Sequence, residues 1–88
     1  MQVVFLGKFS HDLDDLTDAD LKSSVLEIIQ SLEKAAALSH VPGIKKMAGF
    51  KNAFRIRVRD YRIGFYFEND IIELARFLHR SKIYKVWP

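Results

Sequence analysis

Apolar and basic residues alternate most strictly between Phe54 and Arg59, where every second residue is an arginine. Alternation with a period of two predicts a strand that is buried on one face only. A second alternating run begins at Arg62, after the interruption Asp60-Tyr61. We therefore predict a β-hairpin in which Asp60-Tyr61 forms a two-residue loop.

This hairpin sorts its side chains onto an apolar face and a basic face. The predicted register sets Arg59 opposite Arg62, Arg57 opposite Gly64, and Arg55 opposite Tyr66. The apolar face then carries Phe54, Ile56, Val58, Ile63, Phe65 and Phe67. A slip of one residue would expose the apolar set of one strand, so this pairing of faces is well specified. On the basic face, Gly64 leaves a gap where a ligand backbone could approach.

The chain before the hairpin predicts one strand and two helices. A short apolar run predicts a strand over Gln2–Leu6, and helical spacing of apolar residues predicts a helix over Lys8–Leu16. Thr17 and Asp20 form a capping-box pattern at the start of a second helix, which Pro42-Gly43 closes. Its apolar stripe is predicted to pack on the apolar face of the hairpin. The stripe comprises Leu21, Val25, Leu26, Ile28, Ile29, Leu32 and Ala35.

The remaining segments complete a small sheet. Ile44–Asn52 is predicted to be a basic connector, and Asn69-Asp70 is a turn signal before a last strand over Ile71–Leu78. That strand is apolar on both sides, which predicts a central position in the sheet, and Ser81–Trp87 follows as a short helix or turn. The order β-α-α-β-β-β predicts one α+β domain over residues 1–88. We expect a small antiparallel sheet with both helices on one face and the arginines on the other.

Charge is divided unevenly along the chain. Residues 1–44 carry a net charge of −4 and residues 45–88 a net charge of +7, within a total of +3. Same-face arginines recur roughly every 6.5–7 Å along a strand, close to the phosphate spacing of extended single-stranded nucleic acid. A basic sheet face of this kind favours a polyanionic partner over simple solvation, although an acidic protein would also fit.

Neither a metal site nor a disulfide is predicted. The chain has no cysteine, which suits a reducing cytoplasm, and its three histidines lie in different segments without matching carboxylates. A short apolar N-terminal run without a basic leader predicts neither a signal peptide nor a membrane span. We therefore expect a cytoplasmic protein that needs no metal or cofactor.

The candidate chemistry is that of arginine and tyrosine. A guanidinium can hold a scissile phosphate and stabilise the charge that develops on it. Cleavage of RNA through its own 2′-hydroxyl also needs a base to remove a proton and an acid to protonate the leaving oxygen. Tyr84 is the best candidate for one of these roles, with His79 and Lys51 as weaker ones. From the residues alone, binding is better supported than catalysis.

Two stretches carry a family resemblance. Residues 54–66 and the run His79-Arg80-Ser-Lys-Ile-Tyr84 resemble the RelE/ParE superfamily of toxins from toxin–antitoxin systems. The lysine- and glycine-containing run Ile44–Gly49 is also similar to that family's approach to the second strand. The resemblance covers nearly the whole chain, and it implies the same order of elements as the pattern of apolar positions.

The resemblance implies a function and a set of working residues. RelE-like members are ribosome-dependent endoribonucleases that cut mRNA and are neutralised by a cognate antitoxin. Carried over to this chain, the catalytic positions are Arg55, Arg57, Arg62, Arg80 and Tyr84. We expect further RNA contacts from Lys45, Lys46, Lys51, Arg59, Tyr66 and His79. The expected partners are a cognate antitoxin and mRNA on the ribosome.

Two other functions fit the same resemblance. A ParE-like toxin would inhibit DNA gyrase by binding, without nuclease activity. An inactive member would only bind its partner protein. The combination of Arg62, Arg80 and Tyr84 favours the nuclease.

Overall fold

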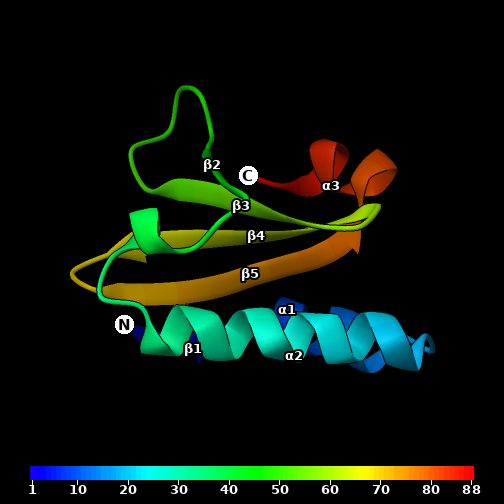
Figure 1. The fold of residues 1–88 in the computed structure, drawn as a ribbon. Helices are drawn as coiled ribbons and strands as arrows, with labels where there is room; N and C mark the ends of the chain where they lie inside the picture. The colour runs from blue at the N-terminus through cyan, green and yellow to red at the C-terminus, as the bar shows by residue number, and fades with distance from the viewer.

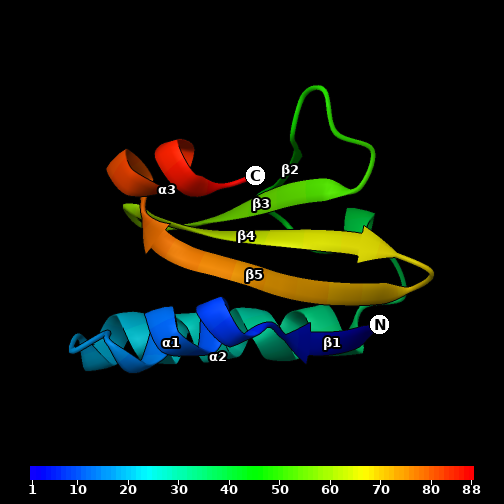
Figure 2. The same cartoon turned by 180° about the vertical axis from the view of Figure 1, so that it is seen from behind.

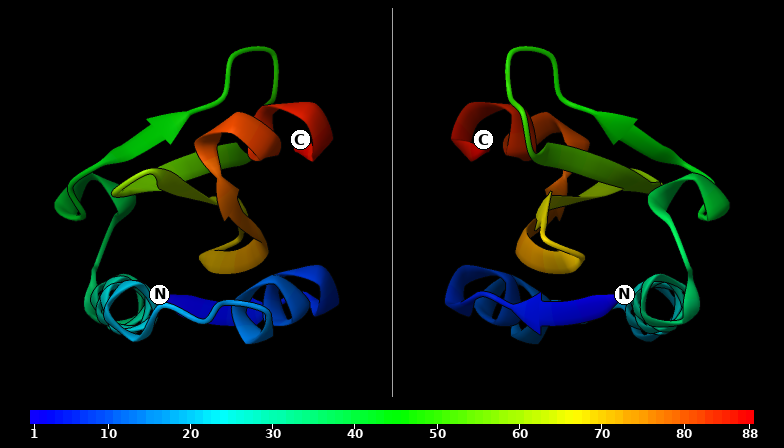
Figure 3. Two further views of the ribbon diagram at one scale, coloured as in Figure 1. Left: turned by 90° about the vertical axis from the view of Figure 1, so that its right-hand side faces the viewer. Right: turned by 90° about the vertical axis from the view of Figure 1, so that its left-hand side faces the viewer.

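The computed structural model describes residues 1–88 and has the α+β fold that the sequence predicts (Figure 1). The strands are β1 (Gln2–Phe5), β2 (Ile44–Lys46), β3 (Ala53–Val58), β4 (Tyr61–Glu68) and β5 (Ile71–His79). The helices are α1 (Gly7–Asp14), α2 (Ala19–Lys34) and α3 (Arg80–Val86), with a 3₁₀ turn at Leu38–His40. Figure 3 shows α1 and α2 on one side of the sheet and α3 on the other.

The five strands form one mixed sheet in the order β1-β5-β4-β3-β2. The predicted central position of the last strand is confirmed, because β5 lies between β1 and β4. The expectation of an antiparallel sheet is wrong for one pair, since β1 runs parallel to β5, as Figure 2 shows from behind. Strand β2, which pairs with β3, was missed within the predicted connector. Three residues at a sheet edge are too few to show a period.

The β3–β4 hairpin keeps its predicted faces, but its loop lies one residue earlier than expected. The observed pairs are Val58 with Tyr61, Arg57 with Arg62, and Arg55 with Gly64, so the predicted register is wrong. The loop is Arg59-Asp60, and Arg59 adopts a left-handed φ of 55°. This earlier turn lets Tyr61 join β4 and stack on Phe77, with 5.1 Å between ring centroids. Because the pairing moves by two residues, every side chain keeps its face.

The main core lies between the apolar face of the sheet and helices α1 and α2. On α2, the predicted stripe is buried at Leu21, Val25, Ile29 and Leu32, whereas Leu26 is 47% exposed. The helix is capped by Asp18 rather than by Thr17, because the Asp18 carboxylate accepts a hydrogen bond from the Leu21 N–H at 3.0 Å. It ends at Lys34, well before the predicted Pro42-Gly43. None of the helices combines the length and the apolar character that crossing a membrane requires.

A second, smaller core lies on the basic face, beneath α3. Ile83 and Trp87 are 1% and 7% exposed and pack with Ala53 and Ala75. The Trp87 indole lies directly over Gly64, where an added Cβ would come within 2.6 Å of the ring. Gly64 therefore makes room for Trp87, and the predicted opening for a ligand backbone is wrong. The basic face is partly covered by a helix instead of being free along its whole length.

Candidate functional site

Four basic side chains line one hollow on the sheet. Lys45 comes from β2, Arg55 and Arg57 from β3, and Arg62 from β4, around a volume of about 220 Å³ that also touches Gly43. The strand register explains the grouping, because Lys45 pairs with Arg55 and Arg57 pairs with Arg62. We call these four residues the basic cluster.

The basic cluster lacks acidic partners. The basic side chains that lie within 4.0 Å of a carboxylate are His11 beside Asp15, Arg76 beside Asp12 and Arg80 beside Asp60, so no member of the cluster has such a partner. Like charges on directly opposed residues destabilise a sheet. The cluster therefore concentrates positive charge at a cost in stability, as expected of a surface that binds an anion.

Arg62 is oriented by the hairpin loop. Its Nη1 donates hydrogen bonds to the carbonyl oxygens of Arg59 at 2.9 Å and of Tyr61 at 2.8 Å. These acceptors are neutral carbonyl oxygens, so they supply no countercharge to the guanidinium. The remaining N–H donors of Arg62 have no partner within the protein and are available to an anion.

Tyr84 joins the cluster from α3. Its side chain is 57% exposed, and the Cζ of Arg55 lies 4.8 Å from the centroid of its ring. The neighbouring Ile83 is buried against the sheet and anchors this turn of the helix. The structure therefore brings a phenol and four cations together, as the sequence predicts for Arg55, Arg57, Arg62, Lys45 and Tyr84.

Arg80 reaches the same hairpin loop from the start of α3. Its backbone N–H donates to the carbonyl oxygen of Asp60 at 2.7 Å, and its Nε lies 4.0 Å from Asp60 Oδ1. Both side chains are largely exposed. Arg80 and Arg62 thus contact adjacent residues of one loop, which extends the positive surface beyond the hollow.

His79 lies on the other face of the sheet. It pairs with Tyr61, and the two rings meet edge to face at 5.5 Å. Its Nδ1 accepts a hydrogen bond from the Ser81 N–H at 3.1 Å and so caps α3. It lines a separate cavity of about 250 Å³ with Asp12 and Lys82. The structure does not bring His79 to the basic cluster.

The other predicted RNA contacts are scattered. Tyr66 packs on Trp87 at 5.6 Å and faces a groove of about 510 Å³ that also contacts Lys8. Lys46 pairs with Phe54 and therefore shares the face opposite to the cluster. Lys51 and Arg59 are exposed in the loops before and after β3. Their predicted roles stay predictions.

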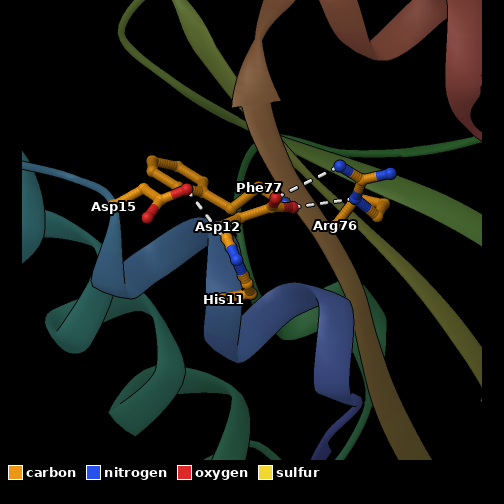
Figure 4. Close-up of polar contacts among 5 residues, drawn as sticks. All are labelled: His11, Asp12, Asp15, Arg76 and Phe77. Carbon is orange, nitrogen blue, oxygen red and sulfur yellow. Dashed lines mark hydrogen bonds and ion pairs between the residues drawn. The ribbon is translucent and has the colours of Figure 1, made fainter.

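One ion pair was not anticipated from the sequence. Asp12 of α1 accepts hydrogen bonds from Arg76 Nε at 2.8 Å and Nη2 at 3.1 Å, and from the Phe77 N–H at 2.9 Å (Figure 4). The hydrogen bond to Asp12 raises the pKa of Arg76 above its ordinary value, while burial opposes the rise. Asp12 thereby binds the edge of β5 beyond the end of β1. No local pattern links residues so far apart in the chain.

Comparison with known proteins identifies the family to which this chain belongs. Residues 3–84 match the family model described as the ParE toxin of the type II toxin–antitoxin system parDE. Toxin RelE3 of Methanocaldococcus jannaschii is 35% identical over 89 residues, which cover 100% of both chains. A chain in the crystal structure of a RelB–RelE antitoxin–toxin complex from Methanococcus jannaschii is 33% identical, with a TM-score of 0.82 over 97% of this chain and 99% of that one.

A more distant structure shares the fold. A chain of the archaeal RelE–RelB complex from Pyrococcus horikoshii OT3 superposes with a TM-score of 0.72 at 19% identity, over 92% of this chain and 96% of that one. The match to the family model spans nearly the whole chain, and the identity to toxin RelE3 extends over its full length. The chain therefore belongs to the RelE/ParE superfamily of toxins from type II toxin–antitoxin systems.

Proposed function

We propose that this toxin is a ribosome-dependent endoribonuclease that cleaves mRNA through attack by the RNA's own 2′-hydroxyl, without a metal ion. The observation that carries the proposal is the basic cluster, which holds four cations without a carboxylate beside an exposed tyrosine. A scissile phosphate in the hollow would gain negative charge in the transition state. Fixed guanidinium groups stabilise such charge because they need no reorganisation as it develops.

The individual roles follow from position. Arg57 and Arg62 bind the scissile phosphate from adjacent strands, and the hairpin carbonyls hold Arg62 in place. Arg80 binds a neighbouring phosphate from the loop side. A guanidinium does not give up its proton near neutral pH, so the hydroxyl of Tyr84 takes part in proton transfer.

A cognate antitoxin is the proposed protein partner. The RelE proteins of M. jannaschii and P. horikoshii were crystallised with RelB. In this chain the basic cluster offers unpaired positive charge, which acidic side chains of an antitoxin would complement. Such contacts would block the hollow to RNA.

The test is mRNA cleavage in a reconstituted translation system. We expect wild-type protein to cut mRNA on tRNA-programmed ribosomes, and Arg62→Ala to lower the single-turnover rate by about 100-fold or more. Tyr84→Ala is expected to lower the same rate by about 100-fold or more, to a residual rate that single-turnover kinetics still measures. Lys34→Ala, which removes an exposed lysine of α2 remote from the cluster, is the matched control. An absence of cleavage by the wild type would contradict the proposal.

Inhibition of DNA gyrase is a second candidate function, because the matching family model describes ParE toxins. A ParE-like toxin would inhibit DNA gyrase by binding and would leave RNA intact. Growth arrest without RNA cuts, together with inhibition of gyrase supercoiling, would establish this alternative. If the protein causes neither RNA cleavage nor growth arrest, it is a member that only binds its partner protein.

A further inference from the structure

We propose that Arg55 is a positioning residue for Tyr84 and not a phosphate ligand. This inference rests on the proposed function of the same site, but the contact behind it exists in the free protein. The Cζ of Arg55 lies 4.8 Å from the centroid of the Tyr84 ring, within the range of a cation–π interaction. No other member of the basic cluster stacks on an aromatic ring in this way.

The surrounding packing explains why Arg55 reaches Tyr84. Arg55 lies opposite Gly64, and Trp87 covers Gly64 from above. The buried Ile83 and Trp87 fix α3 against the sheet on this side, which leaves Tyr84 at the boundary between helix and cluster. Arg57 and Arg62 form the next cross-strand pair on the same face of the sheet, farther along the hairpin towards its loop.

The contact restricts what Tyr84 can do. One face of its ring is covered by the guanidinium, so a nucleobase can stack only on the opposite face. An exposed tyrosine would otherwise sample several rotamers, and the stack favours one orientation of the ring before RNA arrives. Fixed orientation of a reacting group raises the rate of a chemical step more than it raises affinity.

Salt dependence of RNA binding separates the two roles of an arginine. Each phosphate contact on a single strand contributes a slope of about −0.7 to the dependence of log affinity on log salt. With a short single-stranded RNA oligonucleotide, we expect Arg57→Ala to reduce the magnitude of this slope by about 0.7. We expect Arg55→Ala to leave the slope unchanged. An equal reduction in both variants would make Arg55 a phosphate ligand and overturn the inference.

A double-mutant cycle in the cleavage assay tests whether Arg55 acts through Tyr84. We expect Arg55→Ala alone to lower the single-turnover rate about two- to fivefold, and Arg55→Lys, which keeps the charge without the planar group, to fall short of full rescue. In a Tyr84→Ala background, Arg55→Ala should cause no further loss, because the group that it positions is absent. Losses that multiply in the double variant would contradict a positioning role.

A measurement on the free protein keeps this inference separate from the proposed nuclease activity. Stacking on an aromatic ring shields the δ-methylene protons of Arg55 in the NMR spectrum. We expect those resonances to move downfield in Tyr84→Ala and to stay in place in Tyr84→Phe, with the Arg57 resonances unmoved in both. Unchanged Arg55 resonances would refute the contact itself. Absent cleavage with the expected shifts would instead refute only the nuclease proposal.

Discussion

Arg76 and the arginines of the basic cluster lie in the same sheet but in opposite electrostatic settings. Arg76 is 20% exposed and is bound in a bidentate manner by the carboxylate of Asp12. Arg55, Arg57 and Arg62 have no carboxylate partner, and two of them oppose each other across the hairpin. The first arrangement stabilises the fold, whereas the second weakens it and leaves donors free for a ligand.

The number of arginines on a sheet face does not by itself identify a binding site. What distinguishes Arg55, Arg57 and Arg62 is the absence of a countercharge, whereas Arg76, on β5 of the same sheet, is paired with Asp12. Substitutions at the two places should therefore act in opposite directions on stability.

The largest effect is expected from Asp12→Ala. This change leaves Arg76 without its carboxylate and removes the acceptor of the Phe77 N–H, so the free energy of unfolding should fall by about 3 kcal/mol. Urea denaturation measures the loss. The control is Asp15→Ala, because Asp15 is 71% exposed and pairs only with His11 on the same helix. Equal losses of unfolding free energy in both variants would show that the Asp12–Arg76 pair does not stabilise the fold.

An intermediate effect is expected from Gly64→Ala. Gly64 lies on β4 between Arg55 of the basic cluster and Arg76, and pairs with both. The new methyl group would lie within 2.6 Å of the Trp87 ring, so the indole must move and the fold should lose about 2 kcal/mol. Because the chain has a single tryptophan, a shift in its fluorescence reports the displacement directly. Gly7→Ala is the control, since nothing lies within 4 Å of its added Cβ. A native emission spectrum in Gly64→Ala would contradict the packing described here.

The smallest effect is expected from Arg57→Gln, and its sign is the informative part. Removing one of two opposed arginines should raise the free energy of unfolding by about 0.5 kcal/mol while weakening RNA binding. Added salt should stabilise the wild type more than this variant, because salt screens the repulsion between the exposed charges. Denaturation at low and high salt checks both statements. A loss of stability in Arg57→Gln would remove the distinction between the two kinds of arginine.

The sequence predicted those features that depend on local periodicity. Alternation of apolar residues and arginines identified the two faces of the hairpin, and the two-residue shift in strand pairing did not alter them. The arginines of the basic cluster followed from this pattern. Tyr84 was the best candidate for proton transfer among the residues and also matched the family resemblance, although nothing in its local pattern sets it apart from a packed aromatic residue.

The features that were missed depend on contacts between distant segments. Trp87 packs on Gly64, and Asp12 pairs with Arg76. No local sequence pattern relates the residues of either contact. The predicted opening at Gly64 failed for this reason, because a missing side chain can make room for another part of the same chain. His79 was expected to contact RNA, yet its side chain lies on the opposite face of the sheet, where it meets Tyr61 edge to face and accepts the hydrogen bond that caps the start of α3.

The parallel pairing of β1 with β5 has a consequence for the time course of folding. Strands β3, β4 and β5 follow one another and pair through short loops, so their contacts close with little loss of chain entropy. Strand β1 must find a partner that begins at Ile71, near the other end of the chain. Non-local pairings of this kind slow folding. We therefore expect the three-stranded meander to form first and β1 to dock last. The ion pair between Asp12 and Arg76 should form at the same late step, because Asp12 lies on α1, which follows β1 directly.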